Sequence, residues 1–142
     1  MRFFLLSLSK SDSDLIDSLR HFLKKLNDED DALVVVEGLR DAKALRDSGF
    51  LGNLFMLCHN SSLSKLGEEA VKFKKTILLL DNDREGKKLG RRTQRSLRGK
   101  VSVDLYYQRE LLPASKGKIR HVEELSSCSD RLHSPVQVEM AE

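Results

Sequence analysis

The chain has 142 residues, of which 39% are hydrophobic and 33% charged, a balance typical of a globular domain and not of a disordered or membrane protein. Its apolar start, residues 1–9, is shorter than the roughly 20 residues that cross a bilayer and lacks a cleavage site, so we expect a cytoplasmic protein. A net charge of +3 does not by itself indicate a nucleic-acid partner, and two cysteines outside any CxxC pattern indicate no zinc site.

Strands and helices are predicted to alternate along the chain. Apolar residues recur at helical spacing from Ser11 to about Leu26, which predicts an amphipathic helix. Short apolar runs then predict strands that alternate with segments of helical pattern: strands at 32–37, 53–57, 76–80 and 101–107, and helices at 39–48, 61–75 and 84–99. This alternation implies right-handed crossovers and a mainly parallel sheet of about four strands. We therefore expect a Rossmann-like, three-layer α/β/α sandwich.

The end of the chain carries weaker signals. Residues 113–118 are predicted to form a loop and residues 121–128 a short helix. Tyr106 and Tyr107 close the last predicted strand, and we interpret them as packing or surface residues. The sequence therefore predicts three parts of the chain. These are an apolar segment with its amphipathic helix at 1–29, an α/β domain at 30–126 and a loosely ordered tail at 127–142.

Carboxylates follow two of the predicted strands. Glu37 comes directly after VVV, Asp81 directly after LLL, and Asp83 two residues later. Because the carboxyl ends of parallel strands share one edge, where ligands bind, these side chains should converge there. Converging carboxylates repel one another unless a cation lies between them, and an all-oxygen set favours Mg²⁺, with Mn²⁺ as a substitute. The alternative is that DND is only an Asx-type turn.

The predicted helix after DND has one basic face. Its cations share one arc when about 100° is taken per residue: Arg84, Lys88, Arg91, Arg95 and Arg98. The opposite arc carries small and apolar residues: Gly86, Leu89, Gly90, Thr93 and Leu97. A basic face is often simply solvated, but beside an acidic cluster and a helix N-terminus it predicts a track for phosphates. Without interleaved aromatic residues, contact with a nucleic-acid backbone is favoured over base reading.

Two motifs carry a family resemblance. VVVEGLRD at 34–41 and LLLDNDREG at 78–86 together resemble the Toprim domain, the Glu-Gly plus DxD module of type IA topoisomerases, primases and small ribosomal-RNA maturation nucleases. They are most similar to the single-domain Toprim proteins of archaea, which carry a very similar EGxRD and DxDREG pair. The resemblance covers about residues 30–126 and implies the Toprim fold and a Mg²⁺ site.

The resemblance implies a role for each motif residue. Glu37 matches the Toprim glutamate, which is proposed as general acid or base at a phosphodiester. We expect Glu37 to belong to the metal site as well. Asp81 and Asp83 match the metal-binding aspartates. Gly38 and Gly86 match the family's glycines, and a side chain at either position would crowd the metal crevice or the helix start.

Further candidates surround these motifs. Asp41 and Arg40 lie in the EGLRD segment, where Asp41 resembles a supporting polar residue. Lys87 replaces the Glu that follows DxDREG in type IA topoisomerases, which favours phosphate binding over a further metal ligand. His59 follows a predicted strand, and Glu123 lies in KIRHVEEL, a segment similar to a late part of the small Toprim proteins. The remaining histidines show no pattern that indicates a role: His21, His121 and His133.

The leading hypothesis is a Mg²⁺-dependent nuclease of RNA-maturation or DNA-repair type. The alternative is a nucleic-acid-binding module that works within a larger RNA or DNA processing complex and has little activity alone. The expected assembly is a homodimer or a larger processing complex. We do not expect a topoisomerase or complete primase, because gate, template and zinc-binding regions have no counterpart here. A nucleotide-binding phosphotransfer enzyme is disfavoured because neither GxxxxGK[ST] nor GxGxxG is present.

Overall fold

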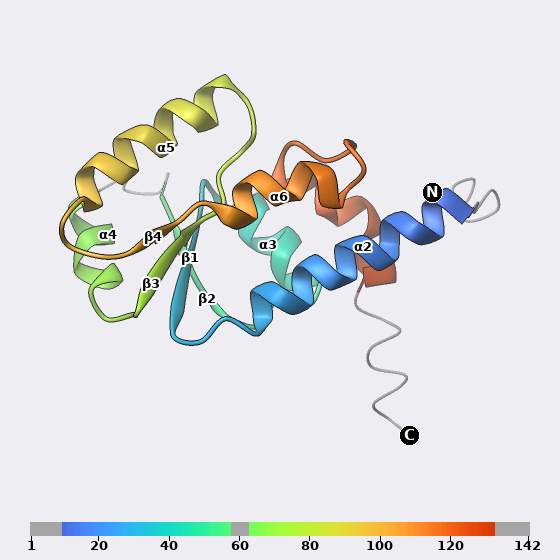
Figure 1. Cartoon of the computed structure of the whole chain (residues 1–142), viewed down its shortest axis with the longest axis horizontal. Coiled ribbons are helices and arrows are strands. Elements are labelled where there is room, and N and C mark those ends of the chain that lie inside the picture. Colours follow the sequence, from blue (N-terminus) through green and yellow to red (C-terminus); the bar gives the residue numbers. More distant parts are fainter. Residues whose placement is uncertain (1–9, 58–62, 133–142) are drawn as a thin grey trace.

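The computed structural model describes residues 10–57 and 63–132, and these form an α/β domain (Figure 1). Helices and strands alternate through most of this part of the chain, as the apolar patterns predict. The elements in chain order are α2 (Lys10–Asn27), β1 (Ala32–Val36), α3 (Leu39–Asp47), β2 (Asn53–Met56), α4 (Leu63–Ala70), β3 (Lys75–Leu78), α5 (Arg84–Leu97), β4 (Val103–Asp104), α6 (Tyr106–Ala114) and η1 (Val122–Cys128), the last a 3₁₀-helix.

The four strands form one parallel sheet in the order β2-β1-β3-β4. Strand β1 lies inside the sheet, where Val34 is in register with Leu54 of β2 on one side and Ile77 of β3 on the other. All five residues of β1 are buried, as expected for a strand covered on both faces. The predicted α/β class with a parallel sheet of four strands is confirmed.

Two layers of helices cover the sheet (Figure 1). Because successive side chains of a strand point to opposite faces, β1 divides its residues between two apolar clusters. Val34 and Val36 pack with α2, α3, α6 and η1, whereas Leu33 and Val35 pack with α4 and α5. This arrangement is the expected three-layer sandwich. No helix within the described residues is long and apolar enough to span a membrane.

The last strand is shorter than predicted. Strand β4 ends at Asp104, and Tyr106 and Tyr107 begin helix α6, which the sequence pattern does not reveal. The side chain of Asp104 accepts a hydrogen bond of 2.8 Å from the backbone N–H of Tyr106, and the ring of Tyr107 packs edge-on against Phe22 of α2. Tertiary packing therefore overrides the β propensity of VSVDLYY. The interpretation of buried Tyr107 as a packing residue is confirmed.

Two other boundaries differ from the prediction. Helix α4 ends at Ala70 instead of residue 75, because Lys75 begins β3 and Lys74 donates its backbone N–H to the carbonyl of Asp31. A loosely ordered tail was expected from residue 127, but residues 127–132 are helical, and Leu132 is buried against the α2 side of the core. Predictions on His59, the apolar start and residues 133–142 fall outside the described residues.

Candidate metal and nucleic-acid site

The carboxyl ends of β1 and β3 bring Glu37 and Asp81 together. Asp81 follows β3 after Leu79, whose N–H donates to the carbonyl of Val35, and Leu80, whose N–H donates to the side chain of Gln108 of α6. Glu37 directly follows β1, and its Oε2 accepts a hydrogen bond of 3.2 Å from the backbone N–H of Asp81. The two carboxylates therefore meet at one sheet edge, as strand order predicts.

Asp83 caps helix α5. Its backbone is extended, and its Oδ1 accepts a hydrogen bond of 2.8 Å from the N–H of Gly86, one of the unpaired donors of the first turn. This hydrogen bond, followed by the contact with His121, lowers the pKa of the Asp83 carboxyl. The second oxygen, Oδ2, faces the centre of the site.

Gly86 allows the helix start to press against the DND turn. A Cβ atom at this position would lie 2.0 Å from the carbonyl oxygen of Asp81, a distance that no side chain tolerates against backbone. The glycine of DNDREG is thus required by close packing of helix start on turn. It fixes where Asp83 stands relative to Asp81.

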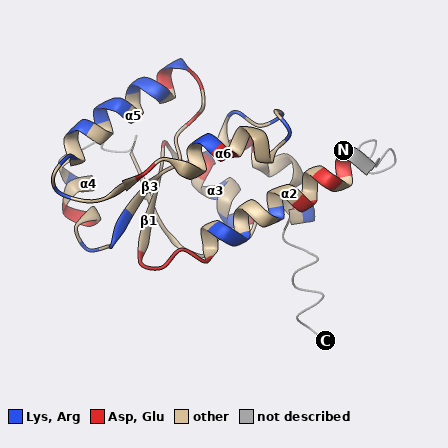
Figure 2. Ribbon diagram, viewed as in Figure 1, with Lys and Arg blue, Asp and Glu red and all other residues tan. Residues whose placement is uncertain are grey.

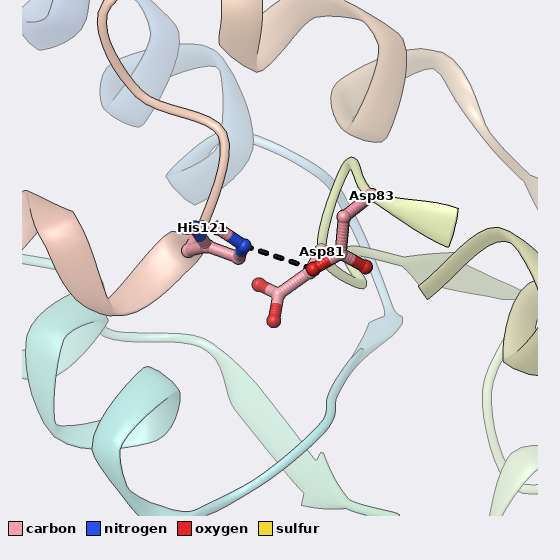
Figure 3. A group of neighbouring side chains, drawn as sticks. All are labelled: Asp81, Asp83 and His121. Carbon is pink, nitrogen blue, oxygen red and sulfur yellow. Dashed lines mark hydrogen bonds and ion pairs between the residues drawn. The ribbon is translucent and has the colours of Figure 1, made fainter. Parts of the chain in front are cut away.

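His121 is the residue that the sequence analysis missed. It precedes η1, and its Nε2 lies 2.9 Å from Oδ2 of Asp83 (Figure 3). One ligand atom each from Asp81, Asp83 and His121 lies within 4.8 Å of the other two. The only signal for it in the sequence is the segment KIRHVEEL, which is similar to a late part of the small Toprim proteins. Within that segment the resemblance indicates Glu123 and not the histidine.

Burial and like charges act on the carboxylates at this edge. Desolvation, followed by repulsion from Glu37 and Asp41, raises the pKa of Asp81 to about 6. Desolvation also raises the pKa of Glu37, where the hydrogen bond from Asp81 opposes it, and the pKa of Asp41. The cluster is therefore costly to keep fully ionised without a cation.

Asp41 supports the turn after β1. It is 7% exposed, and its Oδ2 accepts a hydrogen bond of 3.1 Å from the backbone N–H of Gly38, the residue at the start of α3. Arg40 and Glu123 line a depression between α3 and η1 beside the carboxylate cluster. Arg40 and Glu123 are both exposed, and after burial the charge of Glu123 is among the causes that raise the pKa of Asp41. The supporting role of Asp41 and the roles of Arg40 and Glu123 stay predictions.

Lys and Arg residues recur along the whole of helix α5 (Figure 2). The six basic residues predicted to contact phosphate are all exposed: Arg84, Lys87, Lys88, Arg91, Arg95 and Arg98. The opposite side buries Gly86, Gly90, Thr93 and Leu97 against the sheet. Among the described residues, no carboxylate forms an ion pair with a cation of α5. These charges remain available to an anionic ligand.

The donor set at the DND turn fits a divalent cation. Asp81 uses Oδ1 to accept the N–H of Val122, and Asp83 uses Oδ1 to accept that of Gly86, so each carboxylate is held in place by backbone. Within the described part of the chain, Oδ2 of Asp81 accepts no hydrogen bond. Two carboxylates fixed by backbone contacts, each with a second oxygen outside those contacts, and an adjacent imidazole are suited to a cation.

Fold and site together define a family. Residues 32–124 match the family model described as the Toprim domain, and the chain belongs to that family. Toprim domains bind divalent metals and are associated with nucleic acids, which agrees with the acidic edge and the exposed basic helix.

The chain is also similar to small archaeal proteins. It is 33% identical over 113 residues to a "UPF0292 protein" of Thermococcus gammatolerans, covering 79% of this chain and 78% of that one. A "UPF0292 protein" of Pyrococcus horikoshii is 31% identical over 114 residues, covering 80% of each chain. A solved structure, a "putative protein from Aquifex aeolicus", superposes with a TM-score of 0.59 at 25% identity, covering 82% of this chain and 99% of that one.

Proposed function

We propose that this Toprim protein is a divalent-cation-dependent nuclease of RNA-maturation or DNA-repair type. The observation that supports it is the convergence of Glu37, Asp81 and Asp83 at one sheet edge, with the basic side of α5 beginning at the same turn. A phosphodiester held along α5 would bring its scissile phosphate to the carboxylates. The cation expected from the carboxylates is Mg²⁺, which would neutralise charge on that phosphate.

Each residue has a distinct task in this proposal. Asp81 and Asp83 hold the cation, and Glu37 transfers a proton at the attacking water or the leaving oxygen. The pKa of Glu37 is raised by burial, and a raised pKa brings a carboxyl closer to working near neutral pH. Arg84 and Lys88, which share the basic arc at the start of α5, hold the flanking backbone.

The test is cleavage of labelled structured RNA and of single-stranded DNA by the purified protein in Mg²⁺ or Mn²⁺. Glu37→Gln and Asp81→Asn should each lower the cleavage rate by at least about a hundredfold, since each removes a group that acts on the reacting phosphate. Glu69→Gln is the matched control, because Glu69 of α4 pairs with Lys72, just beyond the end of that helix and away from the site. Cleavage that survives both site substitutions would contradict the proposal.

A nucleic-acid-binding module is the second candidate, supported by the exposed cations that continue along α5 beyond the carboxylates. Five phosphate contacts along this helix would give a slope of log affinity against log salt of about −3.5 to −4.5. Strong, salt-dependent binding without cleavage in any metal would favour this function. A homodimer or larger complex and a cytoplasmic location remain predictions from the sequence.

A further inference from the structure

His121 reaches the DND turn from a distant part of the chain. It lies between α6 and η1, 38 residues beyond Asp83, and its Nε2 contacts Oδ2 of Asp83 at 2.9 Å. The carboxylate of Asp81 points into the same space (Figure 3). An imidazole nitrogen therefore stands where the two aspartates present their oxygens.

Backbone contacts hold this histidine in place. On one side of it, the carbonyl of Arg120 accepts a hydrogen bond of 2.9 Å from the N–H of Asn82. On the other side, the N–H of Val122 donates to Oδ1 of Asp81 at 3.2 Å. His121 is thus fixed between two anchors on the DND turn.

The other nitrogen of the ring faces a second carboxylate. Oε1 of Glu124 accepts hydrogen bonds from the backbone N–H groups of Arg120 and His121, at 2.9 and 3.0 Å. The same oxygen lies 3.8 Å from Nδ1 of His121, longer than a hydrogen bond, and is the carboxylate on that side of the ring. Histidines that bind metals usually direct their second nitrogen to a carboxylate or carbonyl, which fixes the tautomer.

We propose that His121 is a third protein ligand, through Nε2, of the cation held by Asp81 and Asp83, and that it shifts the preferred ion from Mg²⁺ toward Mn²⁺. The inference rests on the proposed function only in placing the cation at the DND turn. Carboxylates suit Mg²⁺ and Mn²⁺ alike, whereas an imidazole nitrogen favours the transition-metal ion. In this role the proton that Nε2 shares with Asp83 would leave to solvent as the cation binds, so that Nε2 offers its lone pair while the ring proton on Nδ1 stays, toward Glu124.

The test is pulsed electron paramagnetic resonance of Mn²⁺ bound to the full chain, together with calorimetric titration of Mn²⁺ and Mg²⁺. Wild-type protein should show hyperfine coupling to a directly bound imidazole nitrogen. His121→Ala should lose that coupling and bind Mn²⁺ more than about tenfold more weakly, with a change of under about threefold for Mg²⁺. His21→Ala is the control, since His21 is exposed on α2, and should keep both properties.

Three results would overturn the inference. These are the absence of nitrogen coupling in the wild type, its persistence in His121→Ala, and an equal loss of Mn²⁺ and Mg²⁺ affinity, which would mean that His121 only orients Asp83. The wild-type spectrum decides even if the variant fails to fold. Nitrogen coupling without any cleavage would refute the nuclease and leave His121 as a ligand, whereas Mg²⁺-dependent cleavage without coupling would do the reverse.

Discussion

The two ends of the sheet both gather charged side chains, but only one end pairs its carboxylates with a lysine. At the end where the strands begin, Nζ of Lys75 lies 2.9 Å from Oε1 of Glu29 and 3.1 Å from Oδ2 of Asp104. The hydroxyl of Tyr107 donates to Oε2 of Glu29 at 2.6 Å. At the end where the strands finish, no described Lys or Arg forms an ion pair with Glu37 or Asp81.

The pKa values reflect this difference. The hydrogen bond to Glu29 raises the pKa of Lys75, which keeps that pair charged. Burial and its acidic neighbours raise the pKa of Asp81 to about 6, so its ionised form is disfavoured. The first cluster joins β3 to β4 and to the segment before β1, and in the second no described Lys or Arg pairs with Glu37 or Asp81. A partly buried carboxylate without a Lys or Arg partner, such as Asp81, is thus a better marker of a candidate site than a paired one, such as Glu29.

Gly86→Ala should produce the largest effect, because it acts on the packing that positions the unpaired carboxylates. A methyl group would meet the carbonyl of Asp81, and neither backbone segment can yield without moving the DND turn. We expect the free energy of unfolding to fall by about 3 kcal/mol, measured by urea denaturation. Gly67→Ala is the control, because a Cβ there meets nothing within 4 Å, and it should stabilise α4 by up to about 1 kcal/mol. An unchanged stability of Gly86→Ala would refute the close approach.

Lys75→Met removes the cation of the paired cluster. Glu29 and Asp104, with side chains 21% and 22% exposed, would then repel each other in a partly dry environment. We expect a loss of about 2 kcal/mol in urea denaturation, below the value for fully buried pairs because solvent still screens this one. Lys72→Met breaks a far more exposed pair with Glu69 and should change stability by less than about 0.5 kcal/mol. Equal losses of stability in Lys75→Met and Lys72→Met would contradict the view that the Lys75 cluster is the more strongly coupled of the two.

Asp81→Asn should raise the free energy of unfolding of the metal-free protein, whereas the two preceding substitutions lower it. Because folding raises the pKa of Asp81 from 3.8 to about 6, the folded state binds its proton more tightly, so wild-type stability falls as pH rises through this window. In EDTA at pH 8 the variant should be more stable by on the order of 1 kcal/mol, after allowance for partial exposure, and the gain should vanish near pH 4. Asp104→Asn is the contrasting variant, which should be destabilised because Lys75 loses a partner. Thermal melts at both pH values provide the measurement.

Local pattern was enough to predict most of the sheet and half of the site. Glu37 and Asp81 directly follow apolar runs, and the rule that parallel strands end at one edge brings them together without further information. The packing side of α5 follows from helical periodicity in the same way. The apolar pattern of VSVDLYY wrongly predicts a strand as far as Tyr107. In the structure Tyr107 lies in helix α6, where its ring packs edge-on against Phe22, which is far away in the sequence.

His121 lay beyond such reasoning for the same physical cause. Its distance to Asp83 is set by α6, by the turn after it and by η1 packing on α3, and none of these leaves a periodic trace in the sequence. The pairing of Lys75 with Glu29 is equally long-range. Sequence pattern therefore reveals residues that the strands themselves carry to an edge. Residues brought there by a connection between elements required the structure.

Arg95→Gln should produce the smallest effect and extends the comparison to the cations. Lys75 is held by two carboxylates, whereas Arg95 is exposed on α5 without a described acidic partner, so its charge is free to contact phosphate. Loss of one phosphate contact should weaken nucleic-acid binding a few-fold and reduce the salt slope by about 0.7 to 0.9, with protein stability unchanged.

Lys24→Gln is the matched control, because Lys24 is an exposed cation on α2 that pairs with Asp28. Fluorescence anisotropy at several salt concentrations separates the two variants. If α5 is the phosphate track, only Arg95→Gln changes the slope, since counterions are released only where a phosphate replaces them. If both variants change affinity slightly and neither changes the slope, the basic side of α5 is a solvated surface, and the carboxylate edge must recruit its substrate through another part of the molecule.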